Sequence, residues 1–574
     1  MPGVRGLSMK TSRWEHRNEN VAVNYFFNKR ITLSSPLGVA AAERTRKFSG
    51  LYPLAAASGY VGNVPNDGLR FLIPAPSNLT GYTAWVVERA AGVADEYWQI
   101  SPHLTPAMPM YPDGTVYDNR HAYYNVYGVA ATGVRTLLNS YDGIQPLRPN
   151  WEEGGIDVTV NNTVLKSRRF RKVGGDAIRI AAGVIGTVIE DCDIASTANG
   201  VSCGNMSDVI VRYSRGWGLN PNVLNAGQGC FVSAYRCTSV TVEHNHNEEF
   251  KFQTLANGDS QQILQTLLCR FNRSLNLNSK KSDGAGGYQF NATADVRSYP
   301  IGHFFQVVNA YRIGNCEISW NEVINLAGKS FTEDVLNFYN SSGTSTSYIL
   351  CHDNILKGAY SIAPNTGSNS GCAIITDGYG RYKGPAGYVG YYGDQYVANF
   401  DPIPANATIE GKLSDPTLNG YQKFYNNVAV GTSNAGVAVG GGCFIEVYGN
   451  RAVASGFTPD GLSIYGCNVG LYSSAQYDNR VNAMDNISFH DNYSTWWQAP
   501  NTVQRPANSV GGNNPYYFYV ADATKPGMFI TNFTQANNVS GPQATLADEK
   551  LEHVNWKIRA QNAGIEPGER SYRP

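Results

Sequence analysis

The sequence predicts an all-β protein that folds as a right-handed parallel β-helix, a solenoid in which short strands stack rung upon rung. Two recurring patterns lead to this prediction. A short apolar strand, one Asn or Asp and a second apolar pair recur along the chain. A glycine or an acidic residue followed by alternating apolar residues precedes many of these units. Together the patterns describe one rung, with three strands, a one-residue corner and a longer loop.

The first pattern places a single corner residue between two apolar strands. Asn, Asp and Gly tolerate the left-handed backbone that such a corner favours. Where rungs stack about 4.8 Å apart, identical Asn side chains can hydrogen-bond along the solenoid. The pattern reads VTVNNTVL at Asn162, VIEDCDIA at Asp193, EISWNEVI at Asn321, ILCHDNIL at Asn354, KFYNNVAV at Asn427, FIEVYGNRAV at Asn450 and ISFHDNYS at Asn492.

The second pattern supplies a further strand of each rung. Alternate residues of such a strand point inward and build a narrow core. A sandwich or a propeller would instead show regular hairpin turns or a fixed blade period, and the sequence has neither. The pattern appears in GGDAIRIA, NGVSCG, GQGCFVSA, EDVLNFY, SGCAIITD, AGVAVGG and PDGLSIYG.

These patterns divide the chain into three parts. They predict a parallel β-helix over residues 151–500, interrupted by a long inserted loop at 378–420. Residues 1–150 are less regular, and we expect them to cap the first rung. Residues 501–574 are expected to form a C-terminal cap or tail that closes the other end.

Composition excludes several classes of protein. Charged residues make up 16% of the chain, and Lys plus Arg equals Asp plus Glu at 45 each. That balance argues against nucleic acid as a partner. No apolar run is long enough to span a membrane. The ten cysteines show no CxxC pair and are expected to be buried and reduced. The polar N-terminus, MPGVRGLSMKTSRWEHRNEN, does not read as a signal peptide.

The rungs resemble those of the pectate-lyase-like superfamily of right-handed β-helices, which includes polysaccharide lyases, glycoside hydrolases, epimerases and phage tailspikes. The resemblance is architectural and covers about 60% of the chain. It implies a polysaccharide or oligosaccharide substrate and an extracellular or secreted protein, or one carried on a phage particle. It also implies a monomer or a homotrimer.

Acidic residues at the loop-to-strand junctions are the catalytic candidates. Glu248 and Glu249 lie in NEEFKFQT, Glu333 and Asp334 in TEDVLNFY, and Asp283 in KKSDGAGGYQF. Doubled acids repel each other and are required by no turn, and such repulsion raises the pKa of one member. The sequence therefore predicts hydrolysis by paired carboxylates, with Glu249 and Asp334 on one face a few rungs apart.

The strand alternation also predicts the groups that bind the substrate. In EEFKFQT, Phe250 and Phe252 would point inward, while Glu249, Lys251 and Gln253 would face outward together. Aromatic faces pack well on sugar rings, and an arginine can hold an acidic sugar. The remaining substrate-binding candidates are Tyr339, Arg179, Trp217, and Tyr379 and Tyr382 of the inserted loop.

Two other functions remain open at this stage. A polysaccharide lyase would use Lys251 as the base that removes a proton beside a uronic carboxylate, and calcium held by acids could assist it. The hydrolase needs no cofactor and no metal. His303, near a strand start, is a further acid–base candidate. The third function is a non-catalytic tailspike or adhesin that only binds glycan.

Overall fold

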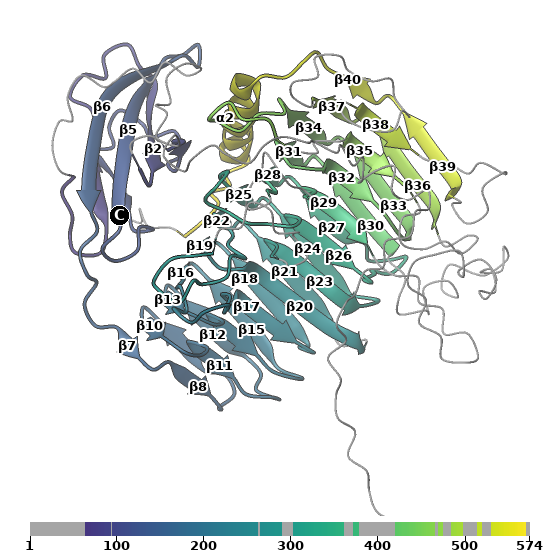
Figure 1. Cartoon of the computed structure of the whole chain (residues 1–574), viewed down its shortest axis with the longest axis horizontal. Helices are drawn as coiled ribbons and strands as arrows, with labels where there is room; N and C mark the ends of the chain where they lie inside the picture. The colour runs from purple at the N-terminus through teal and green to yellow at the C-terminus, as the bar shows by residue number, and fades with distance from the viewer. Residues whose placement is uncertain are drawn as a thin grey trace, which may run out of the picture.

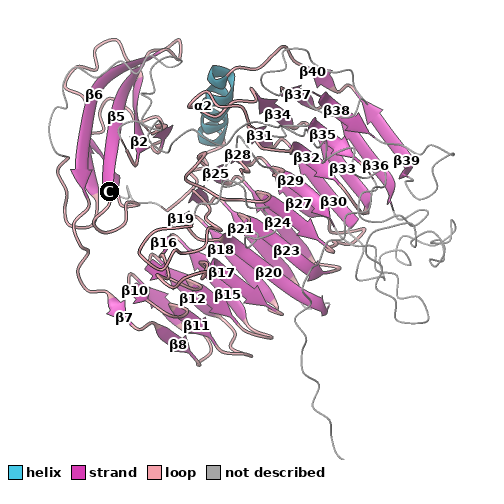
Figure 2. Ribbon diagram, in the orientation of Figure 1, coloured by secondary structure: helices cyan, strands magenta, loops and turns pink. Residues whose placement is uncertain are grey.

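The computed structural model describes residues 64–92, 95–261, 264–289, 302–360, 371–377, 420–464, 469–474, 484–497, 514–518 and 530–569. Three long parallel sheets coil around a common core and form the predicted right-handed parallel β-helix (Figure 1). Among the described residues, strands dominate and a single long helix, α2 (Leu546–Asn562), lies near the C-terminus (Figure 2). The inserted loop predicted at 378–420 lies outside the described residues, apart from Gly420.

Each rung contributes one strand to each sheet, and successive strands of a sheet are three apart in chain order. Sheet A contains β8 (Ile156–Val158), β11 (Ile178–Ile180), β14 (Val201–Cys203), β17 (Cys230–Tyr235), β20 (Phe252–Gln261), β23 (Phe305–Ala310), β26 (Leu336–Tyr339), β29 (Ile374–Asp377), β32 (Ala435–Val439), β35 (Val469–Ser473) and β38 (Asn514–Phe518). Sheet B contains β9 (Val164–Lys166), β12 (Thr187–Glu190), β15 (Asp208–Arg212), β18 (Ser239–Glu243), β21 (Thr266–Arg270), β24 (Asn315–Ser319), β27 (Ile349–His352), β30 (Gly420–Tyr425), β33 (Cys443–Tyr448), β36 (Met484–His490) and β39 (Ile530–Ala536). Sheet C contains β7 (Glu152–Glu153), β10 (Arg169–Lys172), β13 (Asp193–Ser196), β16 (Arg215–Gly218), β19 (His246–Glu248), β22 (Arg273–Leu275), β25 (Glu322–Ile324), β28 (Ile355–Lys357), β31 (Val428–Val430), β34 (Arg451–Ala454), β37 (Tyr493–Trp496) and β40 (Val539–Ser540).

An asparagine ladder runs along the corner between sheets B and C. In each step an amide nitrogen donates to the amide oxygen of the next rung, at 2.8–3.1 Å. The second amide hydrogen goes to a backbone carbonyl, as from Asn321 to Cys269. The buried amides therefore leave no donor unused. The ladder residues are Asn245, Asn272, Asn321, Asn354, Asn427, Asn450, Asn492 and Asn538.

Two of the predicted corner residues lie outside the ladder, although Asn162 has the expected left-handed backbone. At the ladder positions themselves, the left-handed residue is not the one expected. Asn162 lies in the turn before β9, and Asp193 is the first residue of β13. The left-handed backbone belongs to the residue before each ladder position, even where that residue is Phe271 or Trp320. Corner geometry is thus imposed by the stacked rungs, and the Asn serves the hydrogen-bond ladder.

The N-terminal region forms a separate β-structure beside the solenoid. It pairs β1 (Phe71–Pro74) with β4 (Met110–Asp113) and builds an antiparallel sheet in the order β3 (Trp98–Gln99), β2 (Ala84–Ala90), β5 (His121–Val129) and β6 (Arg135–Ile144). Its apolar core extends onto Leu275, Ile324 and Leu326 of sheet C and the turn that follows. The described part of this region therefore flanks sheet C, whereas we had expected a cap over the first rung (Figure 1).

The C-terminal segment also differs from the expected tail. The rungs continue to Ser540, so the predicted boundary at residue 500 falls inside the solenoid. The helix α2 then packs along the side of sheet C, where Trp556 meets Ile355 and Val428. Thr545 caps the helix in a reciprocal hydrogen-bond arrangement with Asp548.

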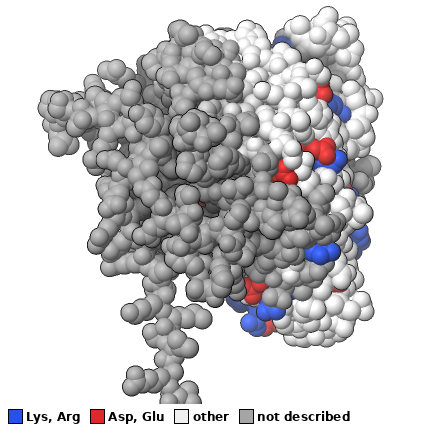
Figure 3. Space-filling view, turned by 90° about the vertical axis from the view of Figure 1, so that its right-hand side faces the viewer, with Lys and Arg blue, Asp and Glu red and all other residues white. Residues whose placement is uncertain are grey.

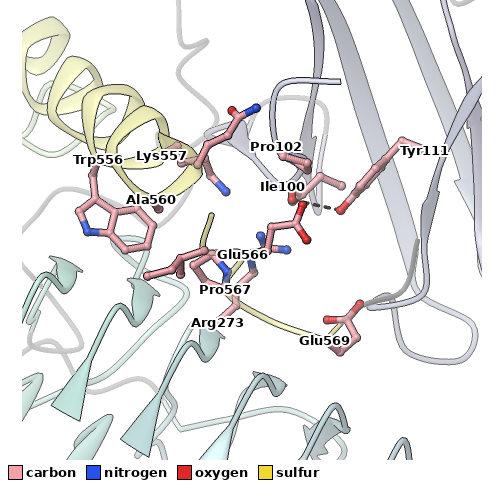
Figure 4. Close-up of a pocket in the computed structure, with 12 residues that line it drawn as sticks. Ile100, Pro102, Tyr111, Arg273, Trp556, Lys557, Ala560, Glu566, Pro567 and Glu569 are labelled. Atoms are coloured by element: carbon pink, nitrogen blue, oxygen red, sulfur yellow. Dashed lines mark hydrogen bonds between the residues drawn. The ribbon is translucent and has the colours of Figure 1, made fainter. Parts of the chain in front are cut away.

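A small cavity lies where the N-terminal region, sheet C and the C-terminal segment meet (Figure 4). Tyr111, Arg273, Lys557 and Glu569 are among the residues that line it. Its volume of about 30 Å³ has room for water and none for a sugar.

Candidate active site

The chain enters sheet A from sheet C at a junction where several polar side chains gather. Strands β23, β26 and β29 pair in parallel, with Phe305, Leu336 and Ile374 side by side. His303, Asp334 and Cys372 each stand two residues earlier, so they occupy equivalent places in three successive rungs. Neighbouring rungs are about 5 Å apart, which brings these side chains within reach of one another.

Asp334 is held in place by the next rung. One carboxylate oxygen accepts hydrogen bonds from the backbone amides of Gly371 and Cys372, at 3.3 and 2.8 Å. The other oxygen lies 3.4 Å from the Asn337 amide nitrogen. The residue is only 2% exposed. Burial raises the pKa of Asp334 above its ordinary value, and the hydrogen bonds only partly offset that rise.

Asp377, the last residue of β29, brings a second carboxylate to Asn337. The Asn337 amide nitrogen lies 3.3 Å from Asp377 Oδ2, so this one amide contacts both carboxylates. The two carboxylate oxygens are therefore at most about 7 Å apart. Burial, together with the charges of Asp334 and Glu333, holds the pKa of Asp377 well above its ordinary value.

His303 and Glu333 form the other side of the cluster. His303 Nδ1 lies 2.9 Å from the carbonyl oxygen of Asp334 and 3.3 Å from its amide nitrogen. The shorter contact requires a proton on Nδ1, which leaves Nε2 with a free lone pair. Nε2 is buried, makes no hydrogen bond and lies 3.7 Å from Glu333 Oε2. Burial lowers the pKa of His303 to about 3, so the ring is neutral.

Lys251 brings a cation to the same junction. Its ammonium lies 5.0 Å from the ring centre of Phe252, and that ring packs against His303. Burial lowers the pKa of Lys251, while the charges of Cys230 and Glu333 oppose the shift. The structure thus brings together Glu333, Asp334 and Lys251 of the predicted site residues.

The expected alternation around β20 is wrong at two positions. Gln253 points into the solenoid, is fully buried and accepts hydrogen bonds from Thr254 and Cys269. Phe252 lies outside, against His303. The cause is the bend at which the chain enters sheet A, where two consecutive residues face inward and the amides of Gln253 and Thr254 both donate to the carbonyl of Phe304. Neighbouring rungs have the same bend, with Phe304 and Phe305 both buried in the core.

Glu248 and Glu249 lie against the N-terminal region, at the end of sheet C. Glu248 is buried and pairs with Arg89 at 2.5 Å and with His246 at 2.9 Å. Despite the burial, the positive charge of Arg89 lowers the pKa of Glu248 to about 2. Glu249 pairs with Arg120 at 3.1 Å. Both acids are held by this interface, and neither shares a contact with Asp334 among the described residues.

Other predicted site residues are placed apart from the cluster. Asp283 is exposed and accepts hydrogen bonds from Ala285 and Gly287 of its own turn. Trp217 cannot stack on a sugar, because it is fully buried and donates to the Thr115 carbonyl. Its ring packs between Tyr117 and Trp151.

Arg179 and the tyrosines complete the set of substrate-binding candidates. Arg179 is exposed on β11 and forms an ion pair with Asp157 at 2.7 Å. Tyr339 is partly exposed on β26, paired with Asp377 of the neighbouring strand. Tyr379 and Tyr382 lie outside the described residues. Tyr339 is therefore the aromatic candidate that stands beside the acid cluster.

Sequence reasoning did not select Asp377. It ends the strand SGCAIITD, and an acid at the end of a strand gives no local signal of function. The available signal was rung register, which places Asp377 beside Tyr339. The register depends on how many residues lie in each loop between successive strands, and the sequence does not reveal where these loops begin and end.

The junction also holds a set of side chains that could bind a metal ion. One ligand atom each from His303, Glu333 and Asp334 lies within 4.8 Å of the other two. Calcium takes six to eight oxygen ligands, and here one of the three protein ligand atoms would be an imidazole nitrogen. The calcium expected for a lyase therefore does not fit these residues, and no catalytic step is assigned to it.

Comparison with known proteins finds similarity in structure alone. No protein-family model and no curated protein sequence matches the chain. A pectate lyase of Erwinia chrysanthemi, in complex with tetragalacturonic acid, matches with 6% identity and a TM-score of 0.18, covering 50% of this chain and 83% of that one. A family 28 exopolygalacturonase of Yersinia enterocolitica matches with 10% identity and a TM-score of 0.21, covering 83% and 86%. A pectate lyase of Pectobacterium carotovorum matches with 9% identity and a TM-score of 0.16, covering 52% and 85%.

Proposed function

We propose that this protein hydrolyses glycosidic bonds of an extracellular polysaccharide or oligosaccharide, using the carboxylates of the junction between sheets C and A. The observation that carries the proposal is the contact of one amide, that of Asn337, with both Asp334 and Asp377. Glycosidases hold their two carboxyl groups about 5 to 9.5 Å apart. A separation of at most about 7 Å is compatible with the roughly 5 to 5.5 Å of retaining glycosidases and excludes the longer part of the inverting range.

The chemistry follows from two carboxyl groups that cannot both ionise easily. Repulsion keeps a proton on one of them while the other is charged. The protonated group donates to the glycosidic oxygen as the bond to the anomeric carbon breaks. The ionised group either attacks that carbon or removes a proton from the attacking water. Partly exposed Glu333 and Tyr339 stand beside the pair and would contact the sugar.

The described residues on one face of the molecule carry few charges. In the view of Figure 3, the described surface is mostly uncharged, with a few acidic and basic side chains interspersed. Among the described residues, no helix is long and apolar enough to cross a bilayer.

The test is an assay of reducing ends released from a panel of polysaccharides, including pectin-type glycans. We expect Asp334→Asn and Asp377→Asn each to lower kcat at least about 100-fold, because each removes one partner of an acid–base pair. Asp157→Asn is the matched control, since Asp157 is also an outward-facing acid on sheet A. Equal activity in Asp377→Asn and Asp157→Asn would contradict the assignment.

A lyase is the second candidate, and the position of Lys251 favours it. The half-buried Lys251 ammonium stands beside Glu333 and near His303, where it could remove a proton from a uronic sugar. A lyase releases an unsaturated product that absorbs ultraviolet light, whereas hydrolysis releases new reducing ends without that absorbance. Loss of the absorbing product in Lys251→Gln would select the lyase. Glycan binding without either product would identify a binding protein.

A further inference from the structure

We infer that His303, Glu333 and Asp334 bind one first-row transition-metal ion, with Zn²⁺ as the representative ion. The inference concerns the acid cluster described above but does not depend on its catalysing hydrolysis. Ligand atoms from the three residues lie within 4.8 Å of one another. They come from two successive rungs, so the solenoid itself sets their spacing.

The first argument is the unused lone pair of His303. Its Nε2 is buried and without a hydrogen-bond partner, although a buried polar atom is costly to leave unpaired. The atom lies 3.7 Å from Glu333 Oε2. That distance is too long for a hydrogen bond. Two ligands of one tetrahedral zinc ion lie about 3.4 Å apart, which the observed pair nearly meets.

The second argument is the set of contacts behind the ligands. A metal-binding histidine usually donates its other N–H to a carbonyl or a carboxylate, and metal-binding carboxylates are themselves hydrogen-bonded. His303 donates from Nδ1 to the carbonyl oxygen of Asp334 at 2.9 Å. Asp334 in turn accepts from the amides of Gly371 and Cys372. Both side chains are thus oriented before any ion arrives.

The third argument is charge and donor chemistry. The carboxyl groups of Glu333, Asp334 and Asp377 lie close enough to influence one another, and Glu333 lies near the Lys251 ammonium. A divalent cation would offset the excess of negative charge. One imidazole nitrogen with carboxylate oxygens suits zinc and related ions better than calcium or magnesium.

The test uses the full chain, stripped of metal with a chelator and dialysed. Titration with ZnCl₂ in a calorimeter should give one site per chain, and Co²⁺ should produce a visible absorption band. We expect His303→Gln to weaken Zn²⁺ binding at least about 100-fold and to abolish the Co²⁺ band. His490→Gln is the control, because His490 is an exposed histidine beside an acid, Asp491, on sheet B. It should bind Zn²⁺ like the wild type.

A second variant keeps the test valid if His303→Gln folds poorly. Glu333→Gln preserves size at a partly exposed position and should also weaken Zn²⁺ binding at least tenfold, with an unchanged circular dichroism spectrum. Excess CaCl₂ should leave the Co²⁺ band in place. The inference is overturned if the wild type binds no Zn²⁺, if Glu333→Gln binds as tightly as the wild type, or if Ca²⁺ displaces Co²⁺. All these measurements omit glycan, so this inference and the proposed hydrolysis can fail independently.

Discussion

At the scale of single residues, the asparagine ladder shows why one side chain type recurs. The side-chain oxygen of each ladder residue accepts two hydrogen bonds from the ladder residue of the preceding rung. Asn354, for example, accepts from both the backbone N–H and the side-chain amide of Asn321. It also donates to a carbonyl and to the next amide. No smaller residue can make these four contacts in a buried corner. The ladder therefore depends on Asn specifically, whereas the preceding left-handed position accepts many residues.

Replacing a ladder residue should be costly. Asn354→Ala leaves the buried amide and side chain of Asn321 without acceptors, so we expect the free energy of unfolding to fall by about 3 kcal/mol or more. Chemical denaturation followed by circular dichroism measures this change. The control is Asn315→Ala on the exposed edge of β24, which should change it by less than about 0.5 kcal/mol. A similar loss in the free energy of unfolding for both variants would show that the ladder hydrogen bonds do not stabilise the fold.

At the scale of elements, α2 is fastened to sheet C by charged groups that are themselves buried. Glu322 of β25 accepts from His553 at 2.7 Å and lies 3.0 Å from Lys557. Glu549 accepts from both the backbone and the hydroxyl of Ser455, at 2.6 Å each. Desolvation raises the pKa of Glu549 to about 7; the charge of Lys357 opposes the rise, and that of Glu96 adds to it.

The raised pKa of Glu549 predicts a pH-dependent stability. The folded state holds the Glu549 proton more tightly than the unfolded state, where the pKa is near 4.5. The resulting stabilisation is complete below about pH 4.5 and is lost as the pH rises through about 7. At 1.36 kcal/mol per pKa unit, the loss is about 3 kcal/mol. Unfolding measured from pH 4 to 8 should show this slope in the wild type.

The variant Glu549→Gln separates this effect from the rest of the protein. Glutamine can still accept from Ser455 but does not titrate, so the wild type should lose about 3 kcal/mol relative to the variant between pH 4 and 8. The slope should persist in Glu552→Gln, which leaves Glu549 in place. An unchanged slope in Glu549→Gln would assign the pH dependence to another group.

At the scale of the whole molecule, buried arginines join the N-terminal region to the solenoid. Arg148 is almost fully buried, pairs with Asp118 at 2.9 Å and lies 3.6 Å from Asp193 of β13. Its guanidinium also stands 4.7 Å from the ring centre of Trp217. The two parts therefore share charged groups that water cannot easily replace.

Breaking this junction should uncouple the two parts. Arg148→Met removes the nearest cation of the buried carboxylate of Asp118, whereas Asp193 keeps Arg169 and Arg215. We therefore expect a loss of about 3 kcal/mol and faster hydrogen exchange in β5 and β6. Hydrogen exchange read by mass spectrometry locates the effect. Arg179→Met, which removes an exposed ion pair from β11, should leave both the exchange pattern and the Tm unchanged. Slow exchange in β5 and β6 of Arg148→Met would refute the coupling.

Taken by itself, the sequence determined the coiled architecture, because strand alternation recurs from rung to rung and the Asn corner recurs along the ladder from Asn245 to Asn538. It also selected Glu333 and Asp334, since doubled acids before a strand stand out locally. Only the tertiary structure showed that Asp377 and His303 lie beside these two acids. It also showed that Glu249 lies at the interface with the N-terminal region, where it pairs with Arg120. Those outcomes depend on loop lengths, on the bend at Gln253 and Thr254 and on how the N-terminal region docks. Each of them is set by contacts between residues far apart in the chain, which no local pattern specifies.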